Sequence, residues 1–160
     1  MDLERFRIDV DADRVAVVTF DRPPVNAQDA RSREEMARVF DTLSERDDVG
    51  AVVLTGAGKL FSAGADLKER GAIAQGPGDY RRHARMTREG FYAITECAKP
   101  VVAAINGGAL GAGCALALAC DILVASEDAY VAMPEIDVGL AGGARFLQRY
   151  FPRSTLRAMY

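Results

Sequence analysis

Hydrophobic residues along this chain recur in short regular patterns that predict alternating strands and helices. Apolar and polar residues alternate over residues 6–10, which is typical of a half-buried strand. The acidic segment 11–13 predicts a turn, after which residues 15–20 return as a second strand. Apolar residues then recur at helical spacing over residues 32–45. This spacing predicts an amphipathic helix, whose buried face comprises Met36, Val39, Phe40 and Leu43.

The remaining pattern predicts an α/β fold. A buried strand over residues 51–55 is followed by a glycine-rich loop at 71–78 and a helix over 80–97. Three further apolar runs predict strands, at residues 101–105, 122–125 and 130–133. Because strands and helices alternate, the strands are expected to be largely parallel.

The end of the chain predicts one more short helix. Pro152 should end a helix, and Ser154 should cap another that reaches only to Tyr160. A helix this short is marginal unless something holds its apolar side. We therefore expect a C-terminal segment to be missing from this sequence.

Composition narrows the classes of function. The chain has 160 residues, 49% of them apolar, which is enough for one domain spanning residues 1–160. A net charge of -3 gives no electrostatic reason to expect nucleic acid or an anionic membrane as partner. No apolar run reaches spanning length, and the acidic N-terminus resembles no targeting signal, so we expect a cytoplasmic protein. One histidine and three cysteines without ligand spacing predict no metal site.

A glycine-rich turn before a helix is the strongest chemical signal. Asn106-Gly-Gly-Ala-Leu-Gly-Ala-Gly-Cys114 follows the strand predicted at 101–105. Backbone N–H groups at a helix start have no partner within the helix and favour negative charge, and small residues allow close approach. The turn could therefore hold a phosphate or a developing oxyanion. The third glycine of a dinucleotide fingerprint and the lysine of a P-loop are both absent, which disfavours nucleotides.

A second turn and a carboxylate favour the oxyanion. Phe61-Ser-Ala-Gly-Ala-Asp-Leu67 follows the strand at 51–55 and should expose backbone N–H groups near Ala65. Two such turns could direct their N–H groups at one carbonyl oxygen and stabilise an enolate. Glu135, fixed behind Pro134 at a strand end, is the candidate base. His83, the only histidine, is expected on an exposed helix face among arginines.

Four segments of this chain, which occur in the same order as in the family, resemble the enoyl-CoA hydratase/isomerase (crotonase) superfamily. They are the two turns above, Asp21-Arg-Pro-Pro-Val-Asn-Ala27 and Pro134-Glu135. The resemblance implies a spiral of ββα units, assembly into homotrimers or hexamers, and an acyl-CoA substrate. It implies no cofactor, since coenzyme A arrives as part of the substrate. It also implies that the family's C-terminal helical region is absent here.

The resemblance also assigns roles to residues. The amides of Ala65 and Ala112 would form the oxyanion hole, and Glu135 matches the family's second catalytic glutamate. Substrate binding would fall to Arg22, Ala63, Asp66, Leu67 and Gly111, although Asp66 could instead brace its turn and Arg22 could be a solvated surface residue.

One position departs from the family's pattern. Ala115 stands where hydratases carry their first glutamate, whereas single-glutamate members include isomerases; Asp137 is an alternative second acid. The expected function is thus an enoyl-CoA hydratase or isomerase. The alternative is a non-catalytic acyl-CoA-binding protein with the same fold.

Overall fold

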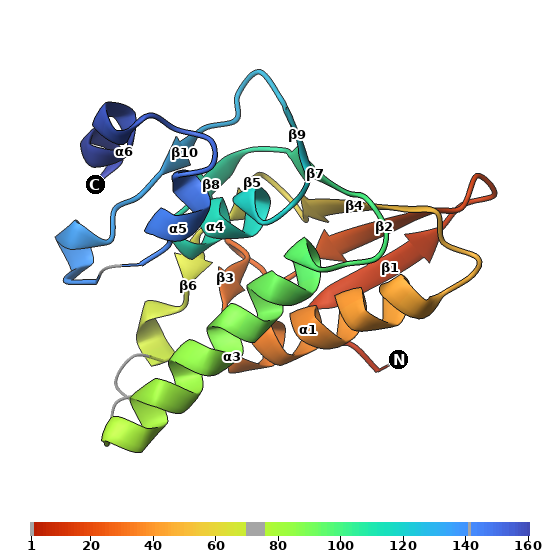
Figure 1. Ribbon diagram of the computed structural model, residues 1–160, viewed down its shortest axis with the longest axis horizontal. Helices are drawn as coiled ribbons and strands as arrows, with labels where there is room; N and C mark the ends of the chain where they lie inside the picture. The colour runs from red at the N-terminus through yellow and green to blue at the C-terminus, as the bar shows by residue number, and fades with distance from the viewer. Residues whose placement is uncertain (1, 70–75, 141) are drawn as a thin grey trace.

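The computed structural model describes residues 2–69, 76–140 and 142–160, and its largest element is a five-stranded sheet (Figure 1). The strand order is β1-β2-β4-β7-β9, with β1 antiparallel to β2 and all other neighbours parallel. The strands are β1 (Phe6–Val10), β2 (Val15–Phe20), β4 (Ala51–Gly56), β7 (Val101–Ile105) and β9 (Ile122–Ala125). The predicted parallel α/β sheet is confirmed.

Short strands follow the long ones and form two smaller sheets. One has the order β10-β8-β5, and the other pairs β3 with β6 in parallel. Their bounds are β3 (Ala27–Gln28), β5 (Leu60–Ser62), β6 (Gly64–Ala65), β8 (Gly108–Leu110) and β10 (Val131–Ala132). A long strand, one or more short strands and a helix thus recur along the chain, which confirms the expected spiral of ββα units.

Helices cover this framework. In Figure 1, α1 (Ala30–Glu45) and α3 (Pro77–Thr95) lie side by side next to the large sheet. The short α4 (Ala112–Leu118) packs against β6 and β8, and α5 (Ala144–Leu147) packs against α4. Near the C-terminus, α6 (Arg153–Met159) lies close to β10, and two 3-10 helices span Leu67–Glu69 and Ile136–Val138. Within the described residues, no helix is long and apolar enough to cross a bilayer.

The first helix follows its sequence pattern closely. All four residues predicted on its inner face are buried in the core. The helix begins before residue 32, because the Asp29 carboxylate caps it by accepting the Ser32 N–H at 2.8 Å. Asp29 thereby places the start of α1 directly after β3.

Other boundaries differ from the expectation in instructive ways. Ser154 is not a cap, since α6 begins at Arg153 without any side-chain cap. The glycine-rich turn before α4 contains the strand β8, because its backbone pairs in parallel with β10 and β5. Most of the predicted loop at 71–78 lies outside the described residues.

Candidate active site

Glycines bring the start of α4 against the turn after β5. Gly111 adopts a φ of 52° between β8 and α4, which favours glycine because it has no Cβ. A Cβ on Gly113 would lie 2.3 Å from the Ser62 carbonyl oxygen, so any side chain there would push α4 away from β5. The small residues of this motif therefore serve close packing of backbone on backbone.

The two turns predicted to hold an oxyanion adjoin each other. A Cβ on Gly64 would lie 3.1 Å from the Ala112 nitrogen and 2.5 Å from the Leu110 carbonyl oxygen. Ala65 is the next residue, and Ala112 is the first residue of α4, where an N–H group has no acceptor within the helix. The structure thus brings together the two turns that carry the predicted donor amides.

Glu135 completes this cluster. It precedes the 3-10 helix Ile136–Val138, and a Cβ on Gly111 would lie only 2.6 Å from its Oε1 atom. Its Oε2 atom is buried and has no hydrogen-bond partner among the described residues. Burial raises the pKa of the Glu135 carboxyl. A half-buried carboxyl next to Gly111, with one oxygen buried and unpartnered, is a group suited to accept a proton from a ligand.

Cys114 and Tyr160, whose pKa values are raised in part by the charge of Glu135, hold their protons, and Ala115 lies in the hydrophobic core. Ala115 is 1% exposed, and its methyl group faces Gly143, so this position contributes no carboxylate. Burial, and then the charge of Glu135, raises the pKa of the Cys114 thiol to about 12. The Tyr160 hydroxyl donates to the Gly142 carbonyl oxygen, and the pKa of this phenol is raised by burial and then by Glu135. The side chain of Asp137 is exposed.

The predicted substrate-binding residues Arg22 and Asp66 contact each other. The Arg22 guanidinium bonds Asp66 at 2.6 Å and Asp29 at 3.0 Å, and donates to the Ala27 carbonyl oxygen at 3.1 Å. Burial alone would raise the pKa of Asp66, but hydrogen bonds from the Lys68 N–H and from Arg22 outweigh it and leave the pKa lowered. Asp66 therefore braces its turn, the alternative that the sequence left open.

A surface hollow of about 490 Å³ lies beside this brace. Residues of the segment after β2 and of the β6 turn line it, among them Arg22, Pro24, Asp66 and Lys68. Ala63, of the same turn, donates its N–H to the Val25 carbonyl oxygen at 2.9 Å, and Leu67 is 49% exposed. All the residues predicted to bind substrate thus lie on the two turns or the segment that packs on them.

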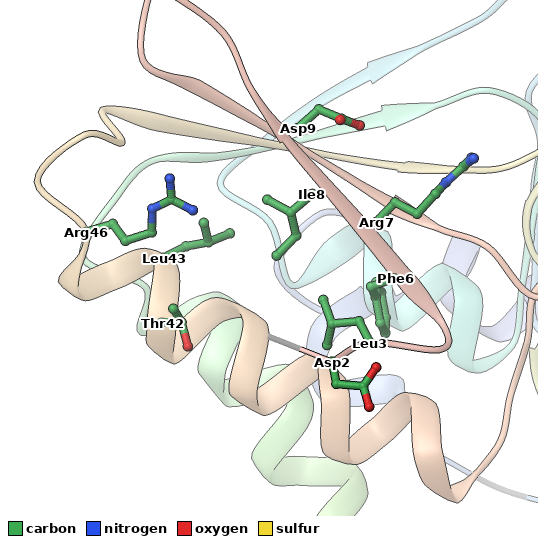
Figure 2. A pocket seen from close by; sticks show the side chains of 9 residues that line it. All are labelled: Asp2, Leu3, Phe6, Arg7, Ile8, Asp9, Thr42, Leu43 and Arg46. Atoms are coloured by element: carbon green, nitrogen blue, oxygen red, sulfur yellow. The ribbon is translucent and has the colours of Figure 1, made fainter.

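A second hollow of about 600 Å³ lies between β1 and α1, where Ile8 and Leu43 face each other (Figure 2). None of the predicted site residues lines it. Within the described part of the chain, no three His, Cys, Asp or Glu side chains gather in a group that could hold a metal ion.

Sequence reasoning missed a set of buried polar residues under the site. Glu69 accepts the Ala30 N–H at 3.0 Å and pairs with Arg33 at 3.1 Å. Arg33 is 4% exposed and also donates to the Gln28 carbonyl oxygen at 2.8 Å. His83 is half-buried, and burial followed by the charge of Arg33 lowers its pKa, so its expected place on an exposed face is wrong.

Comparison with known proteins identifies the family of this chain. The family model described as enoyl-CoA hydratase/isomerase matches residues 11–159. A curated relative from Rhodococcus jostii, named as a (7aS)-7a-methyl-1,5-dioxo-2,3,5,6,7,7a-hexahydro-1H-indene-carboxyl-CoA hydrolase, is 38% identical over 94% of this chain and 58% of its own length. A probable enoyl-CoA hydratase of Bacillus subtilis is 38% identical over 84% of this chain and 52% of its own.

Other relatives extend the range of reactions and include solved structures. The mitochondrial Delta(3,5)-Delta(2,4)-dienoyl-CoA isomerase of Pongo abelii is 39% identical over 91% of this chain and 48% of its own. The structure of Pseudomonas aeruginosa DspI superposes with a TM-score of 0.90 and 35% identity, over 99% of this chain and 62% of that one. The chain thus spans roughly half to three fifths of the length of these relatives. With a matching family model over nearly its whole length, the chain belongs to the enoyl-CoA hydratase/isomerase family.

Proposed function

We propose that this chain carries the active site of an acyl-CoA enzyme that moves a proton next to a thioester carbonyl. The observation that carries the proposal is the unpartnered Glu135 Oε2 atom, buried close to Gly111, the residue before Ala112. The amides of Ala65 and Ala112 hold the thioester oxygen, and Glu135 is the base. Loss of one such donor costs roughly 2.7–4 kcal/mol of transition-state stabilisation.

Isomerisation is the reaction that one carboxylate can complete. In a 3-enoyl-CoA, Glu135 removes a proton from C2, the electrons move into the thioester as a dienolate, and the two amides stabilise its oxygen. The same carboxyl then returns the proton to C4, which yields the 2-enoyl-CoA. The raised pKa of Glu135 supports this role, because a base works best when its pKa lies close to the working pH.

Hydration requires a second group to orient water. Ala115 supplies none, and the thiol of Cys114 and the phenol of Tyr160 are buried or held by a carbonyl. We therefore favour isomerisation over hydration. Hydrolysis, the class of reaction in the name of the Rhodococcus jostii relative, is a third candidate reaction for the same oxyanion site.

We propose that the coenzyme A part binds in the hollow beside the turn that follows β6. Arg22 is occupied by two carboxylates, which leaves Lys68 as the better candidate to meet a phosphate. We also propose the family's oligomeric assembly and a cytoplasmic location. A non-catalytic acyl-CoA-binding protein is the second candidate, and the apolar, buried Ala115 favours it.

One assay separates these functions. The protein is mixed with crotonyl-CoA or with a 3-enoyl-CoA, and the absorbance of the conjugated thioester is followed together with the release of free thiol. A gain of absorbance with the 3-enoyl-CoA indicates isomerisation. A loss of absorbance with crotonyl-CoA indicates hydration, and release of free thiol indicates hydrolysis of the thioester. Binding without any of these changes indicates a non-catalytic binder. The Glu135→Gln variant should bind and not turn over; an unchanged rate would exclude Glu135 from the chemistry.

A further inference from the structure

Gln28, at the end of β3, contacts both turns of the candidate oxyanion site. Its backbone pairs with Ala65 in the β3–β6 sheet, and its carbonyl oxygen accepts the Asp66 N–H at 3.0 Å. Its side-chain Nε2 donates to the Ala112 carbonyl oxygen, also at 3.0 Å. One residue therefore joins the strand that carries Ala65 to the first residue of α4.

Gln28 is itself held firmly. Its side chain is 1% exposed, and its carbonyl oxygen also accepts a hydrogen bond from Arg33 at 2.8 Å. Arg33 pairs with Glu69, which in turn accepts the N–H of Ala30 at the start of α1. Because Arg33 of α1 holds the backbone of Gln28, the side-chain amide of Gln28 can hold the first residue of α4 in one position.

We propose that Gln28 is a positioning residue that sets the direction and separation of the Ala65 and Ala112 amides. The inference rests on the proposed oxyanion function. Gln28 orients the carbonyl of Ala112, the residue whose N–H points at the substrate oxygen, and so limits rotation of the first turn of α4. Hydrogen bonds weaken steeply with angle, so a small rotation there reduces the stabilisation of the oxyanion.

A purely structural role for Gln28 makes a different prediction. Loss of a buried hydrogen bond would lower stability, yet the donors would still polarise a bound thioester as before. The test therefore uses the thioester carbonyl as its readout. Butanoyl-CoA labelled with ¹³C at the carbonyl is saturated and cannot isomerise or add water, so its C=O stretch can be recorded in the bound state.

The variant is Gln28→Met, which keeps the length of the side chain and removes its donor. The matched control is Thr95→Val, because the Thr95 hydroxyl donates to the Ala119 carbonyl oxygen at 3.3 Å, at the opposite end of α4. We expect the wavenumber of the C=O stretch to fall when butanoyl-CoA binds to the wild type or to Thr95→Val. In Gln28→Met it should return toward the free value, with kcat lowered about tenfold and KM changed less than about threefold.

Each outcome decides the proposal. Equal carbonyl shifts and equal kcat in Gln28→Met and Thr95→Val would overturn it while leaving the oxyanion function intact. A wild type that binds butanoyl-CoA without any shift would overturn the oxyanion function and the inference with it. The shorter Gln28→Asn, which cannot reach Ala112, is the second variant. If neither variant folds, as judged by circular dichroism, Gln28 serves the fold and the positioning role is refuted.

Discussion

Replacing Gly111 by alanine tests the location of the base more directly than replacing the base itself. A Cβ at this position would lie 2.6 Å from Glu135 Oε1, far inside van der Waals contact. The atom it meets is the end of a flexible side chain, so the carboxyl can move aside rather than forcing the backbone apart. We expect the fold to survive and the carboxyl to leave its place beside the Ala112 amide.

The stability cost comes chiefly from the backbone. Gly111 has a φ of 52° and a ψ of -117°, a conformation that costs a residue with a side chain about 1–3 kcal/mol. Gly58 is the matched control, since its φ is 74° and no atom lies within 4 Å of a Cβ placed there. Both variants should lose free energy of unfolding in urea, because each places a side chain on a residue with positive φ.

Turnover should separate the two variants. A positioned base contributes about 10²–10⁴-fold to the rate, so Gly111→Ala should lose about a hundredfold or more in kcat, while Gly58→Ala keeps the wild-type kcat. The assay is the appearance of conjugated thioester from a 3-enoyl-CoA, run alongside urea unfolding of each variant. If Gly111→Ala turned over as fast as Gly58→Ala, the chemistry would not take place beside Gly111, and the reasoning would be refuted.

Three further predictions follow from burial and charge. The folded-state pKa of Glu135 is raised, so the folded protein binds more protons than the unfolded chain between the two pKa values, and stability falls as the pH rises through that interval. Glu135→Gln should therefore raise the free energy of unfolding above that interval and leave it unchanged below the unfolded-state pKa. An equal gain at both pH values in urea titrations would contradict this. Glu69→Gln should lower the free energy of unfolding by about 1–2 kcal/mol, because it leaves the buried Arg33 charge unpaired, and a change within about 0.5 kcal/mol would show that the pair contributes little. Burial raises the pKa of the Cys114 and Cys120 thiols, so a thiol reagent at pH 8 should modify only the half-buried Cys97 in the folded protein and all three cysteines in urea; rapid reaction of a second thiol without urea would mean that α4 opens.

Those parts of the fold that depend on local patterns could be predicted from the sequence. The helical spacing from Met36 to Leu43 predicted the buried face of α1, and the apolar run Val101–Ile105 is a strand with the bounds expected for it. Both patterns indicate which side of an element faces the core. This can be predicted because it depends on residues that are close together in the sequence. The two glycine-containing turns and Glu135 also stood out, because their residue types are unusual beside apolar strands.

The buried polar support under the site could not be predicted in this way. The hydrogen bond from Gln28 to Ala112 joins positions 84 residues apart, and the pair between Arg33 and Glu69 joins positions 36 apart. In the sequence, Arg33 resembles any arginine on the polar side of an amphipathic helix. Its burial depends on tertiary packing, in which its guanidinium bonds Gln28 and Glu69, and the packing of α3 on α1 places His83 close to its charge.

The environment of Glu135 connects these observations to the reaction. A carboxyl that both removes and returns a proton must be able to hold that proton for a time, and burial of Glu135 shifts its equilibrium toward the protonated form. Cys114 and Tyr160, which feel the charge of Glu135, do not compete for the proton, since the Cys114 thiol has a pKa of about 12 and the Tyr160 hydroxyl is engaged with a carbonyl oxygen. Because position 115 is an alanine, it supplies no second acid to orient water. The same arrangement that weakens the case for hydration therefore suits a proton that leaves one carbon and returns to another.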